Sequence, residues 1–146
     1  MDDWLVDGSP GAQSVFKTCR NKTLTEEEVV DADGCGTTGP PVFKQYISSH
    51  PGETYPLVHS TMLEVYNNSY VSHAGNYYTV YGAVNQLYPS NTKWIISGHS
   101  LGAALAELCS ADLGARGVKI NSVYMLADPS PGNDVYRGIY LSLIHI

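Results

Sequence analysis

Hydrophobic and polar positions follow the most regular pattern in the second half of the chain. From 76 to 88, apolar and aromatic residues recur at intervals of three and four positions, which predicts one face of an amphipathic helix. A β-rich run follows at 94–96, then an Ala- and Leu-rich helical pattern over 103–113 that we expect to end at Gly114, and a second apolar run at 123–126. Helix, strand, helix and strand in this order predict βαβ units and a parallel sheet.

The first half is dominated by turn-forming residues. Residues 8–39 are rich in Gly, Pro and Thr and are predicted to be loop, apart from a short helix that a capping box at 25–28 predicts. Behind Pro41, apolar residues at 42, 43, 46 and 47 have helical spacing, so a second short helix is expected there.

Composition and charge exclude several classes of protein. The chain has 146 residues, 14 acidic and 8 basic, for a net charge of −6, and it lacks the basic stripe with which proteins neutralise nucleic-acid phosphates. Hydrophobic residues make up 43% and charged residues 15%, which is too little charge for a disordered tail. No apolar run approaches the roughly 18 residues that a membrane-spanning helix needs. We therefore expect an acidic, soluble, globular chain that binds no nucleic acid and has no transmembrane segment.

Both ends of the chain are unusual for a mature protein. The acidic residues 1–4 lack the apolar core of a secretory signal peptide. The last six residues, 141–146, are those that the bases CTG TCT CTT ATA CAC ATC encode, a string that resembles a transposon-type sequencing adapter. We expect residues 1–140 to be a partial domain, truncated at both ends, and residues 141–146 to be a non-native tail. A genuine amphipathic tail is the alternative.

Cysteines and glycosylation sequons bear on the compartment. Cys19 and Cys35 lie in one Gly- and Pro-rich stretch, where a disulfide would close a loop of about 15 residues and contribute roughly 3 kcal/mol. Cys109 lies inside a helical pattern and is expected to be a small buried hydrophobic residue. Sequons begin at Asn21 and Asn67. A pair of cysteines beside a sequon favours secretion or the lumen of the secretory pathway.

The sequence that carries chemistry is Gly98-His99-Ser100-Leu101-Gly102, a G-x-S-x-G motif between a predicted strand and a predicted helix. Such an abrupt strand-to-helix turn strains the backbone and exposes the serine hydroxyl above the sheet edge, which predicts Ser100 as a nucleophile. A Cβ at Gly98 or Gly102 would collide with the neighbouring strand or helix. The N–H of Leu101, at the helix N-terminus, is predicted to be one oxyanion-hole donor. A chance match to the pattern is the alternative.

The turn around Ser100, which we call the elbow, lies within a longer stretch of similarity to a known family. The segment 94–113 contains it; upstream, Val58-His59 precedes a helical pattern with Leu63 and Tyr66, and downstream 127–133 ends in Gly-Asn. These segments resemble the elbow, the Val-His segment and the Gly-x-Pro-Arg-Val-Gly-Asn turn of the fungal-type (class 3) triacylglycerol lipases. The chain departs from the family at Thr61-Met62, where Gly-Phe is usual, and at Ser130, where Arg is usual.

The beginning of the chain resembles the lid of these lipases, a Trp-bearing amphipathic helix over the active site. Trp4, Leu5 and Val6 are large apolar residues between acidic ones, and they are the predicted lid residues. A short helix that merely packs against the domain is the alternative. Residues 8–57 are longer than the corresponding family segment, so we expect an insertion there.

The resemblance implies an α/β-hydrolase-type three-layer sandwich, incomplete in this chain. It also implies hydrolysis of carboxylic esters of lipids at a lipid–water interface, with no metal and no other cofactor. Other esterases on this fold, such as a phospholipase or a feruloyl esterase, are alternatives, because the elbow does not set acyl specificity. A non-catalytic protein that uses the groove for binding is a further alternative.

Partners for the serine are not assigned within the chain. The family's catalytic Asp and His follow the Gly-Asn turn, and its other oxyanion donor precedes the lid, so all three are expected outside these 146 residues, and the chain itself is expected to be inactive. His50, His59 and His73 precede the serine, whereas the α/β-hydrolase order is Ser, Asp or Glu, His. His99 is expected to pack and hydrogen-bond behind the strand. Asp128 is a candidate acid, but we favour a carboxylate that caps its own loop.

Overall fold

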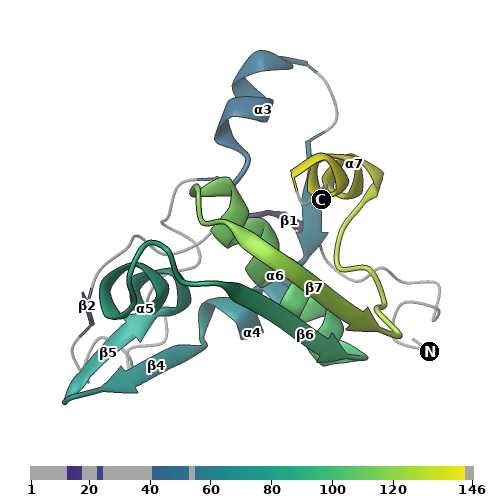
Figure 1. Cartoon of the computed structure of the whole chain (residues 1–146). Helices are drawn as coiled ribbons and strands as arrows, with labels where there is room; N and C mark the ends of the chain where they lie inside the picture. The colour runs from purple at the N-terminus through teal and green to yellow at the C-terminus, as the bar shows by residue number, and fades with distance from the viewer. Residues whose placement is uncertain (1–12, 18–22, 25–40, 53–54, 144–146) are drawn as a thin grey trace.

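The computed structural model describes residues 13–17, 23–24, 41–52 and 55–143, in which short strands and helices alternate (Figure 1). The strands are β1 (Gln13–Val15), β2 (Thr23–Leu24), β3 (Leu57–His59), β4 (Tyr70–His73), β5 (Asn76–Thr79), β6 (Trp94–His99) and β7 (Ile120–Leu126). The helices are α3 (Lys44–Ser49), α4 (Ser60–Asn67), α5 (Val80–Leu87), α6 (Leu101–Ala115) and α7 (Asp134–Leu143). Among the described residues, none of the helices combines the length and the apolar character that a membrane span requires.

Strands β6 and β7 form a parallel pair joined by α6, as the alternation of helix and strand predicted. Side chains along β6 alternate between a half-buried and an exposed face, as the two-residue period of a strand requires. Ile95, Tyr124 and Leu126 lie on the exposed face, where they are 67%, 61% and 66% exposed. One face of the pair is therefore packed on α6, and the other presents apolar side chains.

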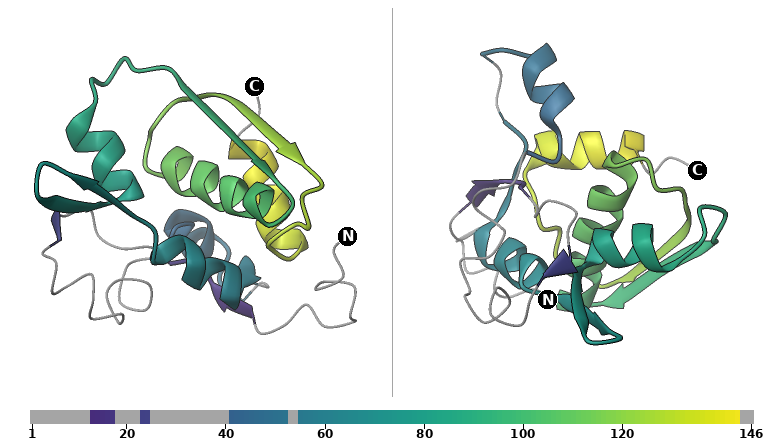
Figure 2. Two further views of the ribbon diagram at one scale, coloured as in Figure 1. Left: turned by 90° about the horizontal axis from the view of Figure 1, so that it is seen from below. Right: turned by 90° about the vertical axis from the view of Figure 1, so that its left-hand side faces the viewer.

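Helix α6 lies between this strand pair and α4, and α7 packs against it (Figure 2). Small residues line its buried surface, where Ala103, Ala104 and Ala111 are fully buried. Because alanine has only a Cβ, the helix axis can approach both neighbouring layers closely. This brings the beginning of α6 directly to the carboxyl ends of β6 and β7.

An aromatic cluster joins segments that are far apart in sequence. The rings of Phe16, Phe43 and Tyr136 contact one another with centroid separations of 5.8 to 6.0 Å, and all three are buried. Phe16 directly follows β1, Phe43 directly precedes α3, and Tyr136 lies in α7. The cluster therefore holds the β1–β3 pair and the α3 segment against α7.

The helix predicted over 76–88 is wrong in its first four residues. They form strand β5, which pairs antiparallel with β4 and β2. The two-residue turn Ala74-Gly75, with φ of 52° and 83°, has the geometry that closes a tight β-hairpin. Thr79 then caps α5, because its Oγ1 accepts a hydrogen bond from the Gly82 N–H at 2.9 Å. Tyr77 of β5 has the spacing of the helix that follows, so the hydrophobic pattern alone does not mark where the strand ends and the helix begins.

Two further boundaries differ from the sequence expectation. Helix α6 continues past Gly114, and the left-handed residue that ends it is Gly117, with φ of 88°. The helix behind Pro41 starts at Lys44, because Phe43 turns into the aromatic cluster instead. At the other end of the chain, α7 runs to Leu143 and includes the first residues of the predicted non-native tail.

Candidate functional site

The turn between β6 and α6 places Ser100 at an exposed corner of the fold. Ser100 has φ of 55° and ψ of −121°, a conformation that non-glycine residues rarely adopt. Its N–H donates to the Leu126 carbonyl at 2.8 Å, and its carbonyl accepts from the N–H groups of Ala103 and Ala104 at 3.0 and 3.2 Å. Strained conformations persist only where surrounding bonds fix them, and they gather at functional sites. The predicted strand before the serine and the predicted helix after it are both present.

The two glycines of the elbow have different reasons to be small. A Cβ on Gly98 would lie 2.2 Å from the Gly102 carbonyl oxygen and 2.7 Å from the Ala103 nitrogen, so no side chain fits there. A Cβ on Gly102 would meet no described atom within 4 Å. The expected steric requirement is therefore confirmed for Gly98 and is wrong, among the described residues, for Gly102. Gly102 is exposed in the first helical turn, and only its backbone carbonyl faces Gly98 of β6.

The beginning of α6 provides an electropositive surface beside Ser100. The N–H groups in the first turn of a helix have no acceptor within the helix and carry the positive end of its dipole. Leu101 is the first residue of α6 and is 45% exposed. An oxygen atom that gains negative charge next to Ser100 would therefore meet backbone N–H donors without displacing a protein acceptor within the helix.

Three of the histidines have different surroundings. His99 is exposed, because it lies on the sheet face opposite α6, so its expected packing behind the strand is wrong. His59 is buried at the end of β3, and burial lowers its pKa. His50 stacks on Tyr46 with ring centroids 4.0 Å apart, and its Nδ1 lies 2.9 Å from the Tyr46 carbonyl oxygen. In the described chain, His50 therefore has a local structural role at the end of α3.

The turn after β7 is strained as well and lies beside the elbow. Ala127 and Ser130 have φ of 57° and 60°. The Asp128 Oδ1 accepts a hydrogen bond from the Ser130 N–H at 2.9 Å, so the predicted loop-capping role of Asp128 is confirmed. Because Leu126 accepts from Ser100, this turn directly follows the backbone group that holds the nucleophile candidate.

Gly132 and Asn133 tie this turn to β3 and α7. A Cβ on Gly132 would lie 2.2 Å from the Tyr136 ring, which excludes any other residue. The Asn133 Oδ1 accepts from the N–H groups of Leu57 and Tyr136 at 3.1 and 2.9 Å. Sequence reasoning quoted Gly-Asn as a family feature and missed this bridging role. An asparagine directly before an amphipathic helix was the available signal.

A buried carboxyl group on α6 was also missed. Glu107 is only 5% exposed, and burial, the largest cause, together with the neighbouring Asp128 raises its pKa to about 9. Glu107 lies among alanines and leucines in the sequence, and their apolar pattern predicts the helix without assigning a role to this residue. An acidic residue inside an otherwise apolar stretch was the signal.

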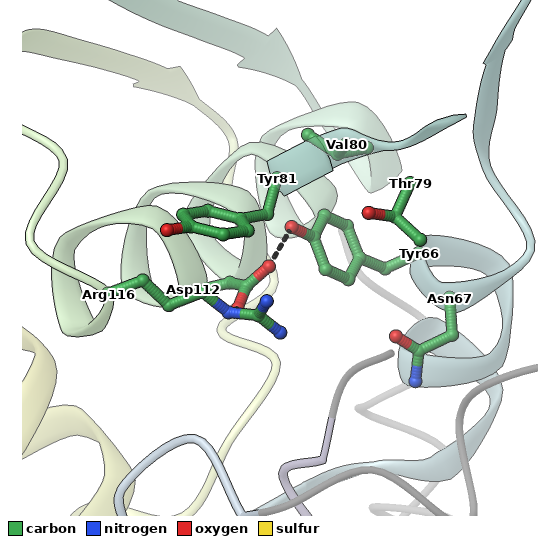
Figure 3. Close-up of a pocket in the computed structure, with 7 residues that line it drawn as sticks. All are labelled: Tyr66, Asn67, Thr79, Val80, Tyr81, Asp112 and Arg116. Carbon is green, nitrogen blue, oxygen red and sulfur yellow. Dashed lines mark hydrogen bonds and ion pairs between the residues drawn. The ribbon is translucent and has the colours of Figure 1, made fainter. Parts of the chain in front are cut away.

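The other end of α6 holds a second group of polar side chains around a small pocket (Figure 3). The Tyr66 hydroxyl donates to Asp112 Oδ2 at 2.6 Å, and Arg116 Nε donates to Asp112 Oδ1 at 2.8 Å. The Arg116 guanidinium also lies over the Tyr81 ring, 4.5 Å from its centroid. Asp112 is twelve positions after Ser100, about 18 Å along a helix, so this pocket is separate from the elbow.

Asn67, at the edge of this pocket, begins one of the two predicted sequons. It is buried, and its Nδ2 donates to the Lys17 carbonyl at 2.9 Å. A glycan must be attached to that same nitrogen, so the folded structure uses the sequon as a packing element. Cys109 nearby is a free thiol that is half-buried, and burial raises its pKa to about 12. It is therefore a protonated residue that packs against the core, although it is less buried than expected.

Several predicted residues lie outside the described part of the chain. These are the lid residues Trp4, Leu5 and Val6, the predicted disulfide partners Cys19 and Cys35, and the sequon residue Asn21. The lid and the disulfide stay predictions, and so does the compartment inferred from the disulfide. The same holds for residues 8–57 as an insertion.

Three comparisons with known proteins identify the family of the chain. Neither the curated proteins nor the solved structures gave a match. A family model described as Lipase (class 3) matches residues 11–145, a span that includes the strand pair, the elbow and the Gly132-Asn133 turn. The family has the α/β-hydrolase fold, with which the parallel β6–α6–β7 unit agrees, and its members are lipase-like ester hydrolases. The chain belongs to the class 3 lipase family.

Proposed function

We propose that this protein is a serine hydrolase of carboxylic lipid esters and that Ser100 is its nucleophile. Membership of the class 3 lipase family supports ester hydrolysis in general. The observation that carries the specific proposal is the backbone conformation of Ser100, with φ of 55° between β6 and α6. That conformation leaves the serine exposed at the carboxyl end of a parallel strand, where α/β folds place their reactive groups.

In the proposed reaction, the Ser100 Oγ attacks the ester carbonyl carbon while a histidine base accepts its proton. The carbonyl oxygen becomes an oxyanion, and the Leu101 N–H at the helix N-terminus donates to it. Collapse of this intermediate releases the alcohol, which takes the proton from the histidine, and leaves an acyl-serine. Water then cleaves the acyl-serine by the same steps and releases the fatty acid. The histidine and the carboxylate that orients it are not assigned to residues described here.

A fluorophosphonate probe tests the nucleophile in the full-length gene product. We expect the probe to bind covalently to Ser100 and Ser100→Ala to abolish both labelling and ester turnover, by at least about a thousandfold in rate. Ser97→Ala is the matched control, because Ser97 is an exposed serine on the same strand outside the turn, and it should label normally. Labelling that persists in Ser100→Ala would refute the proposal. Turnover of long-chain acyl esters, compared with short-chain ones, then measures the lipid preference.

A further inference from the structure

The carboxyl group of Glu107 has an environment that an ionised glutamate does not tolerate. Its side chain extends from the second turn of α6 into the interior and is 5% exposed. Its Oε2 is buried and has no hydrogen-bond partner among the described residues. Leaving a buried carboxylate oxygen without a donor is strongly unfavourable, so the protonated form of the group is favoured.

The side chains around Glu107 come from the turn after β7 and from α7. The Asp128 carboxyl and the Tyr136 hydroxyl both lie close to the Glu107 carboxyl, and Asp128 raises its pKa whereas the Tyr136 hydroxyl and Arg137 lower it. Tyr140 approaches from α7 as well. Two ionised carboxylates have no hydrogen to share and repel each other. One proton between them turns the same contact into a strong, charge-assisted hydrogen bond. Arg137 is exposed and offsets only part of the remaining negative charge.

These contacts close a ring around the elbow. Ser100 begins α6, and α6 carries Glu107. Glu107 contacts Asp128 in the strained turn, and that turn follows Leu126, whose carbonyl accepts the Ser100 N–H at 2.8 Å. The two strained backbones, at Ser100 and at Ala127, are therefore neighbours in one ring.

We propose that Glu107 and Asp128 share one proton and that this carboxyl pair is a positioning element, which holds the turn after β7 against the elbow. Glu107 donates the proton, and one Asp128 oxygen accepts it. The other Asp128 interaction, with the Ser130 N–H, keeps the turn in its left-handed conformation. The inference rests on the proposed function only for its catalytic consequence, because the positioning itself involves no substrate.

The pair makes the elbow sensitive to alkaline pH. The pKa of Glu107 rises from an ordinary 4.5 to about 9 in the folded protein. The folded state therefore binds one more proton than the unfolded state between these values, and the folding equilibrium constant should fall about tenfold per pH unit across that window. Below pH 4.5 both states are protonated, and above pH 9 neither is. Loss of the proton near pH 9 should release the turn.

The test compares wild-type protein with Glu107→Gln, which keeps a donor toward Asp128 but does not titrate. Between pH 6 and 9, the folding equilibrium constant of wild type should fall more steeply with pH than that of Glu107→Gln. The difference should be up to about tenfold per pH unit, which corresponds to the release of one proton on unfolding. Hydrogen-exchange protection of the Ser100 N–H should fall at least about fivefold as the pH approaches 9 in wild type and stay constant in Glu107→Gln. Glu64→Gln, an exposed site on α4, is the matched control and should follow wild type.

Two results would overturn the inference. Equal pH slopes for wild type and Glu107→Gln would show that no proton is shared. A shared proton without any change in Ser100 N–H protection would show that the pair does not position the elbow. Neither measurement uses ester hydrolysis or probe labelling, so both are independent of the proposed function.

Discussion

The polar groups at the two ends of α6 differ in exposure: those at its beginning are exposed, and those toward its end are buried. At its beginning, Ser100, Leu101 and Gly102 are exposed, and the N–H groups of Leu101 and Gly102 have no acceptor within the helix. Toward its end, Asp112 is 2% exposed and accepts from both Tyr66 and Arg116, at 2.6 and 2.8 Å. One helix therefore has an end that is open to a ligand and an end that is closed by its own side chains.

If Ser100 is the nucleophile that we propose, the difference separates the reactive part of the fold from the part that stabilises it. Donors at the open end must stay without protein acceptors if they are to bind an oxyanion, so they contribute little to folding. The closed end fixes α4, α5 and α6 together through Tyr66, Tyr81 and Arg116, where each hydrogen bond stabilises the folded state (Figure 3). The exception is Gly98, which lies at the open end and is still essential to the backbone geometry.

The largest expected effect tests that exception. In Gly98→Ala the new Cβ would lie 2.2 Å from the backbone oxygen of Gly102, which cannot move without unwinding the start of α6. We expect a loss of at least about 3 kcal/mol in the free energy of unfolding, measured by urea denaturation. A loss below about 1 kcal/mol would show that the elbow adapts easily and that the two ends differ less than we infer.

An intermediate effect is expected at the closed end. Tyr66→Phe removes a hydroxyl that donates to a buried carboxylate, and a hydrogen bond to a charged group contributes about 1.5–3 kcal/mol. The same denaturation experiment measures the loss. Tyr88→Phe is the control, because Tyr88 is 51% exposed, and its change should stay within about 0.5 kcal/mol. Equal values for the two variants would remove the stabilising role of the closed end.

The smallest effect is expected for Gly102→Ala at the open end. Its Cβ would meet no described atom within 4 Å, and alanine is the better helix former. The substitution should therefore leave the free energy of unfolding unchanged or raise it by up to about 1 kcal/mol. Strong destabilisation by Gly102→Ala would mean that both elbow glycines are constrained alike.

The sequence predicted the structure correctly where a pattern of residues fits only one local structure. The G-x-S-x-G spacing predicted a strand, a turn and a helix around Ser100, and the hydrophobic runs predicted the parallel β6–β7 pair. It was misleading at β5, where Tyr77 fits a helical stripe and a pleated strand equally well. Glu107 and Asn133 could not be assigned, because their roles depend on groups brought near by the fold: Asp128, 21 positions away, and Leu57, 76 positions away.

The Asn133 bridge has a consequence for the order of folding. It joins residues 76 positions apart, whereas the contact between Trp94 and Asn121 that closes the β6–α6–β7 unit joins residues 27 positions apart. By the logarithmic dependence of loop entropy on length, the longer closure costs about 1 kcal/mol more. The parallel unit with its elbow is therefore expected to form first, and β3 to dock with α7 onto an elbow already in place.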